Sequence, residues 1–214
     1  MANVLGSLAP GFLIAAPPLG DPNFDRTVVL LAMHGDEGAL GFVVNRRAPM
    51  TLGELLVLAG YGDAGIADDT PVYFGGPVQP SSGWIVCLDP TLAGDESGVI
   101  AVGERVRVTS SRAAFDALVH DVLHPVGRPG APEDGGRRAG PAHPDPKHRM
   151  VMLGYSGWGA GQLEGEIAAG AWLPVPLDEG VLFDVPLGDK WEQAYALLGL
   201  TPAGMMSSHN VGEA

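Results

Sequence analysis

The sequence has one cysteine, very little lysine and no long apolar run, and each shortage excludes a class of protein. Cys87 has no partner for an internal disulfide, which argues against a cross-linked extracellular scaffold and fits a reducing compartment. No apolar stretch reaches the roughly 20 residues that span a bilayer, and residues 1–10 lack the basic and apolar parts of a signal peptide. We therefore expect a soluble, cytoplasmic protein that is not bound to a membrane.

Basic residues of both kinds are scarce, because 12 Lys and Arg stand against 25 Asp and Glu, for a formal net charge of −13. Most non-specific affinity for DNA comes from basic side chains that neutralise phosphates, so direct DNA binding is disfavoured. It would require a local basic surface. The arginines that could build one are Arg46, Arg47, Arg105, Arg107 and Arg112, with Arg137 and Arg138 as a further pair.

The length and composition predict one folded domain over residues 1–214. With 214 residues, 46% of them hydrophobic, the chain is large enough to bury a core without cross-links. Residues 124–148 are rich in Pro and Gly, and their only large aliphatic side chain is Val126. Because this segment cannot bury enough apolar surface to offset its ordering entropy, we expect a mobile loop inserted into the domain. We also expect a short flexible tail from residue 201.

Hydrophobic patterning predicts strands that are later interspersed with helices. β-branched and apolar runs predict strands at residues 11–16, 26–34, 39–45, 71–78, 83–89, 98–103, 105–109, 149–156 and 180–185. Helices are predicted after the capping box Thr51–Glu54, after Ser110 or Ser111, over residues 162–172, and after Pro186 with Trp191, Ala194, Tyr195 and Leu198 on its apolar face. Early hairpins without steady βαβ alternation indicate an α+β fold.

The segment GYSGWGAGQLE, residues 154–164, is the most suggestive motif. A dinucleotide-binding turn needs G-x-G-x-x-G, whereas the glycines here give G-x-G-x-G. Glu164 and Glu166 at the start of the following helix favour its dipole and would repel a phosphate. A nucleophile elbow needs G-x-S-x-G, but Trp158 occupies the last position, and the only histidine after Ser156 is His209. The sequence therefore favours a structural turn.

The remaining reactive side chains show no catalytic or metal-binding pattern. Cys87 alternates with Ile85 on one face of a predicted strand, as a buried small residue does, although a redox-sensing thiol stays an alternative. His34 lies in a turn with two acidic residues but without zinc-ligand spacing. His120 and His124 have a spacing that can chelate zinc or simply favour a helix C-terminus. We therefore predict a non-enzymatic protein with no catalytic residue, metal or cofactor.

Several segments together resemble one family. GFLIAAPPLGDPNFDRTVVLL, HGDEGALGFVVNR, VYFGGPV and LGYSGWGAGQLEGEIAAGAWL are similar, in the same order, to bacterial proteins of the YqgE/AlgH family. The resemblance runs from about Phe12 to about Leu198, with residues 124–148 as an added segment. It implies an α+β fold with a strongly bent, mostly antiparallel sheet that forms a pseudo-barrel flanked by helices. The family is usually described as transcriptional regulators, and it supplies no catalytic residue or cofactor to carry over.

Two functional hypotheses follow. The first is a regulatory protein that affects transcription through a protein or small-molecule partner. The second is a small-molecule-binding protein or an enzyme of unknown chemistry, whose pocket offers backbone donors, amide groups and aromatic walls. The residues of that pocket would be Asn45, Gly75, Gly76, Pro77, Tyr155, Trp158 and Gln162. The alternative reading is that these glycines serve turns and the aromatic side chains fill the core.

Overall fold

The computed structural model describes residues 7–17, 19, 21–61, 68–89, 98–123 and 148–204. The strands are β1 (Gly11–Ala15), β2 (Val28–Gly35), β3 (Gly38–Val43), β4 (Arg47–Thr51), β5 (Pro71–Phe74), β6 (Val78–Leu88), β7 (Val99–Val102), β8 (Val106–Thr109), β9 (Arg149–Gly159) and β10 (Trp172–Pro176). The helices are α1 (Leu52–Leu58), α2 (Arg112–Leu123), α3 (Gln162–Ala168), α4 (Glu179–Phe183) and α5 (Lys190–Ala196). None of the helices in these described ranges has the length and hydropathy needed to cross a bilayer.

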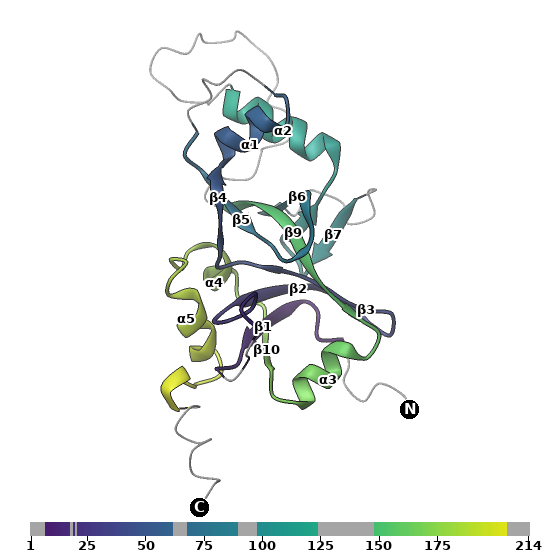
Figure 1. The fold of residues 1–214 in the computed structure, drawn as a ribbon, viewed down its shortest axis with the longest axis vertical. Helices are drawn as coiled ribbons and strands as arrows, with labels where there is room; N and C mark the ends of the chain where they lie inside the picture. The colour runs from purple at the N-terminus through teal and green to yellow at the C-terminus, as the bar shows by residue number, and fades with distance from the viewer. Residues whose placement is uncertain are drawn as a thin grey trace, which may run out of the picture.

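The ten strands join in one strongly bent sheet, as predicted (Figure 1). Its main path runs β10-β1-β2-β3-β9-β6-β8-β7, and every neighbouring pair on that path is antiparallel. Strand β5 pairs with β9 in parallel and with β4 in the antiparallel sense. In Figure 1, α1 and α2 lie at one end of the molecule, while α3 and the pair α4–α5 lie on different sides of the other end.

The bend follows from strands that are apolar on both faces. In β1, Phe12 and Ile14 point into one core and Leu13 and Ala15 into another, and each of these side chains is at most 1% exposed. The first of these, the inner core, also takes Val175 from β10 at one end of the strand path and residues of β7 and β8 from the other. One core that collects side chains from both ends of a sheet requires the sheet to curl around it.

Helices cover the two outer faces of the curl. Leu163 of α3 packs on the outer face of β1, β2 and β3, with Trp158 and Trp172, in what we call the α3 core. Helices α1 and α2 pack on the outer face of β5, β6 and β9 in a third core, which includes Cys87 beside Ile85 as predicted. The strand β9 contributes to all three cores, so it is the element that joins the two halves of the molecule.

The capping box is confirmed, because Thr51 Oγ1 accepts from the Glu54 N–H (3.3 Å) and Glu54 Oε2 accepts from the Thr51 N–H (2.8 Å). Two other predictions are wrong. Residues 180–185 do not form a strand, because Asp178 Oδ1 accepts from the Val181 N–H (2.8 Å) and caps α4. The third helix does not continue to residue 172, because β10 begins there and carries two prolines that a helix would not accept.

The last helix is partly as predicted. Trp191, Ala194 and Tyr195 are buried, whereas Leu198 is 38% exposed and lies beyond the end of α5. Strand β4 was not expected from the sequence. Of the predicted insertion, residues 124–147 lie outside the described part of the chain, and so do residues 205–214 of the predicted tail.

Candidate functional site

Strand β9 carries two of the seven candidate residues, Tyr155 and Trp158, and the backbone at Gly154 decides which way each of them faces. Before Gly154, Met150 and Met152 point into the inner core. At Gly154 the backbone has φ +70°, and the alternation shifts by one residue. Tyr155 then points to the inner core and Trp158 to the α3 core. A side chain at Gly154 would run into the Gly76 carbonyl oxygen, so this position has both conformational and steric reasons to be glycine.

The turn at Gly75 and Gly76 is packed against the backbone of β9 around Gly154. The Gly75 N–H donates to the Leu153 carbonyl (2.8 Å), and the Gly75 carbonyl accepts from the Val43 N–H (2.8 Å) and from Ser156 Oγ (3.2 Å). Gly76 has φ +152°, and a Cβ there would run into the backbone of Tyr155. The predicted backbone donor at Gly75 is therefore engaged inside the protein.

On the outer face, Glu166 of α3 collects the polar groups of the motif. Its Oε2 accepts from the indole N–H of Trp158 (2.9 Å) and from that of Trp172 (2.8 Å). Its Oε1 accepts from Gln162 Nε2 (2.8 Å), while Gln162 Oε1 accepts from the Gly159 N–H (3.0 Å). Two of the candidate residues, Trp158 and Gln162, thus fasten α3 to the sheet.

The neighbouring carboxylate on α3 makes a second such contact. Glu164 Oε1 lies 3.2 Å from Nε2 of His34, whose side chain is 1% exposed. His34 Nδ1 accepts from the Leu8 N–H (3.1 Å), which assigns the ring proton to Nε2. The sequence reading gave Glu164 and Glu166 only a helix-dipole role and missed both partners. The available signal in the sequence was that Trp158 and Trp172 lie on either side of Glu166. The sequence does not show which side of α3 faces the sheet, so it does not identify Glu166 as the acceptor of the two indole N–H groups.

On the inner face of the same strand segment, the residues are more exposed and make fewer polar contacts. Tyr155 is half-buried, and its ring packs edge-on to Trp84 at 6.1 Å between centroids. Gly157 is exposed and lies opposite Leu40 of β3. Among the described residues, the Tyr155 hydroxyl has no hydrogen-bond partner. Of the candidate residues, Tyr155 thus keeps a polar group that no described residue uses, and Pro77 is exposed at the adjacent turn.

Asn45 is not brought together with the other candidates. Its Oδ1 accepts from the Val28 N–H (2.9 Å) and its Nδ2 donates to the Arg26 carbonyl (2.9 Å). Asn45 follows the C-terminal end of β3, whereas Trp158 pairs with Ala39 near the N-terminal end of that strand. The side chain of Asn45 therefore holds the start of β2 and lies apart from the groups around residues 155–162.

Four of the five arginines that a DNA-binding surface would need are engaged within the protein. Arg46 donates to the carbonyls of Pro22, Asn23 and Asp25 at 2.8–3.0 Å. Arg107 is only 9% exposed and donates to the Val106 carbonyl (2.9 Å). The remaining ion pairs of this set are Arg105–Glu179 (2.8 Å) and Arg112–Asp116 (3.0 Å). Of the five, Arg47 is the exposed arginine for which the described residues show no hydrogen bond or ion pair.

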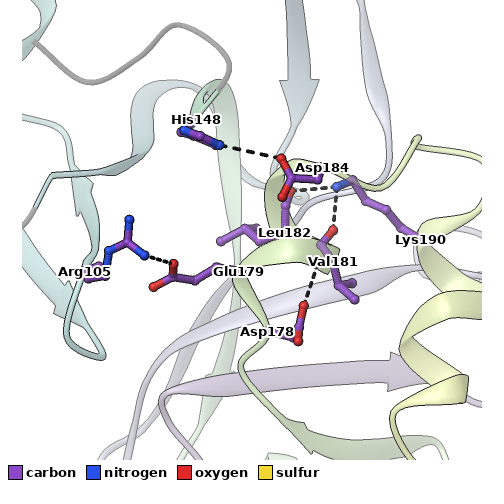
Figure 2. Close-up of polar contacts among 8 residues, drawn as sticks. All are labelled: Arg105, His148, Asp178, Glu179, Val181, Leu182, Asp184 and Lys190. Atoms are coloured by element: carbon purple, nitrogen blue, oxygen red, sulfur yellow. Dashed lines mark hydrogen bonds and ion pairs between the residues drawn. The ribbon is translucent and has the colours of Figure 1, made fainter.

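A polar cluster joins α4 to the opposite wall of the curl (Figure 2). Arg105 of the β7–β8 turn contacts Glu179, and His148 Nε2 lies 3.6 Å from Asp184 Oδ1. On the other side of α4, Lys190 donates to the carbonyls of Val181 (2.7 Å) and Leu182 (2.6 Å). Figure 2 shows α4 held from two sides, by Arg105 and His148 on one side and by Lys190 on the other.

Lys190 and Cys87 have shifted pKa values but little access to a substrate. Burial lowers the pKa of Lys190 to about 8, against the opposing effect of Asp184, and the residue is 3% exposed. Burial raises the pKa of Cys87 to about 11, assisted by Asp89, so the group is a thiol at neutral pH. Within the described ranges, no three His, Cys, Asp or Glu side chains gather as metal ligands would.

These features define a class of protein: an α+β fold whose curled, mostly antiparallel sheet encloses one core and carries helices on its outer faces. The sequence pattern of the AlgH-like family matches residues 12–128 and 137–203, and the chain belongs to that family. The gap in the match falls within the predicted insertion.

Relatives and solved structures agree with this assignment. The chain is 41% identical to a UPF0301 protein from Anaeromyxobacter dehalogenans, over 97% of this chain and 96% of the relative. It is 39% identical to one from Azoarcus sp. over 91% and 90%. The solution structure of the AlgH protein from Pseudomonas aeruginosa is similar with a TM-score of 0.69 and 30% identity, over 100% and 98% of the two chains. A crystal structure of a Corynebacterium diphtheriae protein shares the fold, with a TM-score of 0.59, 19% identity, and 91% and 88% coverage.

Proposed function

We propose that this protein is a regulatory protein that affects transcription through a protein partner and does not itself contact DNA. The resemblance to the YqgE/AlgH family supports the regulatory part of the proposal. We further propose that the chain acts as a single domain, since one sheet holds all ten strands of the described residues. The single cysteine supports the proposal that the protein works in the cytoplasm.

The observation that carries the choice of partner is the state of the arginines. A protein that binds DNA without a dedicated motif needs free cationic side chains on one surface. Here Arg46 bonds to three backbone carbonyls, Arg107 is buried, and Arg105 and Arg112 are paired with carboxylates. The formal charge of −13 adds long-range repulsion from phosphates. Both observations argue against DNA as the direct partner.

Of the seven candidate binding residues, we propose that Tyr155 and Pro77 contact the partner and that the others hold the fold. Asn45, Trp158 and Gln162 support this division, because the polar groups of all three bond within the protein. A small-molecule pocket built from those amides and indoles would need these bonds to break first, at a cost of about 1–3 kcal/mol for each group left unsatisfied.

The test compares complementation with DNA binding. A strain that lacks the gene is complemented with the wild type or with the triple variant R47A/R105A/R112A, and transcript levels are measured. We expect the deletion to change transcript levels, and both proteins to restore them. Failure of the triple variant alone would favour direct DNA contact. Unchanged transcript levels in the deletion strain would contradict a regulatory role.

A further inference from the structure

An apolar strip crosses four strands, β2, β3, β9 and β6, on the inner face of the sheet. Met33 of β2 lies opposite Leu40 of β3, and Leu40 lies opposite Gly157 of β9. Side chains of directly paired residues share a face of the sheet, so these positions are neighbours. Tyr155 follows on β9, opposite Val78 of β6. We call this set, together with Trp84, the Tyr155 surface.

The surface has no side chain at Gly157. A Cβ added there would lie 3.4 Å from Tyr155 Cε2 and 3.9 Å from Val78 Cγ2, which are ordinary van der Waals contacts. The backbone at Gly157 is not in the left-handed region, so conformation does not require glycine. A methyl group at this position would therefore touch Tyr155 and Val78 without displacing them, and an apolar side chain of a partner can pack over Gly157 against the Tyr155 ring.

The surface is also open to solvent. Met33 is 51% exposed, Gly157 is exposed, and Leu40, Val78 and Tyr155 are half-buried. Single exposed apolar residues are common on proteins, but a contiguous apolar strip marks an interaction site more often. The tyrosine hydroxyl, which lacks a described partner, offers one polar group to orient a ligand.

Charge beside the strip indicates what the partner carries. The β2–β3 hairpin that bears Met33 and Leu40 has Asp36 and Glu37 at its tip, and both are exposed. Leu40 is two residues from the start of β3, which is about 7 Å along a strand. A basic side chain two or three residues from an apolar anchor on an extended segment therefore reaches the acidic tip.

We infer that the Tyr155 surface docks an extended segment of a partner protein, in which a bulky apolar side chain packs over Gly157 against the Tyr155 ring and a nearby Lys or Arg meets Asp36 and Glu37. This inference deepens the proposed function and rests on it for its biological meaning. The binding itself can be tested independently.

The direct test selects peptides from a random displayed library on the wild-type protein. We expect enrichment of sequences with Phe, Leu or Met two or three residues from Lys or Arg. An enriched peptide is then titrated by calorimetry into the wild type and into G157L, M33D and L58D. Leu58, on α1, is 75% exposed and lies away from the Tyr155 surface, so it provides the control for loss of an exposed apolar residue.

Affinity should fall about tenfold or more in G157L and M33D and stay within about twofold in L58D. Because Met33 is exposed, M33D should fold, and it therefore still tests the inference if G157L does not fold. Enrichment of acidic or featureless peptides, or equal affinity in all four proteins, would overturn the inference.

Complementation then separates the two proposals. If the wild type restores transcript levels in the deletion strain and M33D does not, both proposals are supported. If M33D restores them as well as the wild type, the docking surface is wrong and the regulatory role stands. If the deletion changes no transcript while the peptide selection succeeds, the regulatory role is wrong and the docking surface stands.

Discussion

The two faces of β9 beyond Gly154 are built from one short motif and are in opposite states. On the outer face, the indole of Trp158 is 7% exposed and bonds to Glu166, which also accepts from Trp172 and Gln162. On the inner face, Tyr155 is half-buried, Gly157 has no side chain, and Met33 nearby is 51% exposed. On the outer face the two indoles, Gln162 and Glu166 bond to one another, while the inner face keeps exposed apolar surface around Gly157.

This difference teaches that neighbouring residues of a motif need not share a function. In a strand, successive side chains point to opposite sides, so GYSGW sends Tyr155 and Gly157 one way and Ser156 and Trp158 the other. The structure therefore places Tyr155 on the other face of the sheet from Trp158 and Gln162. The outer residues hold α3, and we propose that the inner ones contact a partner.

The largest expected effect comes from Gly154, the residue at which the side chains of β9 change faces. Ala at this position must adopt φ +70° and meets the Gly76 carbonyl, so G154A should lose about 4 kcal/mol of unfolding free energy. Urea denaturation measures the loss. Gly165 on α3 has open space and is not in the left-handed region, so G165A should gain up to about 1 kcal/mol. Equal unfolding free energies of G154A and G165A would contradict the structural role of Gly154.

Removing the acceptor on the outer face should have the next largest effect. E166A leaves two buried indole N–H groups without a partner and should lose about 3 kcal/mol of unfolding free energy. E166Q keeps one carbonyl oxygen and should lose about 1 kcal/mol. Tryptophan emission of E166A should shift as the environments of Trp158 and Trp172 change. Wild-type stability in E166A would mean that α3 is held by apolar packing alone.

Lys190 tests whether α4 excludes water from the buried amine as fully as α3 excludes it from the outer face of β9. Burial lowers its folded-state pKa to about 8, below the ordinary 10.5. Below pH 8 the lysine is protonated in both states, and between pH 8 and 10.5 only the unfolded chain keeps the proton. The unfolding free energy should therefore rise with pH in that window, by about 2 kcal/mol between pH 8 and 10, relative to K190M.

Chemical denaturation of both proteins at several pH values checks the Lys190 prediction, and the difference between them cancels other titrating groups. A constant difference across pH 7–10 would show that Lys190 keeps its ordinary pKa and that α4 leaves the amine accessible to water.

The inner face should give the smallest effect on stability. G157A adds a methyl group at ordinary contact distances, and M33S removes an exposed side chain. Both variants should unfold within about 0.5 kcal/mol of the wild type. A loss above 2 kcal/mol in either, measured by urea denaturation, would show that the inner face is structural as well.

The sequence predicts local structure well where local chemistry decides it. The Thr51–Glu54 capping box, the strands of the first hairpin and the burial of Cys87 follow from adjacent residues, and all are observed. Residues 180–185 read as a strand because Val181, Leu182 and Val185 are apolar, but the Asp178 cap starts a helix there. Periodicity cannot distinguish a short buried strand from a short buried helix.

The candidate site was less predictable for a different reason. Glu166 receives bonds from Trp158 and Trp172, residues in two different strands, and His34 reaches Glu164 across 130 positions. Such partners are fixed by how α3 lies on the sheet. The face switch at Gly154 is likewise invisible in the sequence, because a glycine in a strand can mark a bulge, a close approach or neither.

The most direct test of the two-face account is a methyl NMR titration of the methionine-labelled protein with an enriched peptide. Met33 lies on the inner-face strip, while Met50 packs with α1 in the third core. The account predicts that the Met33 signal shifts as peptide is added while that of Met50 stays in place. A Met33 signal that does not move while the peptide binds would contradict it.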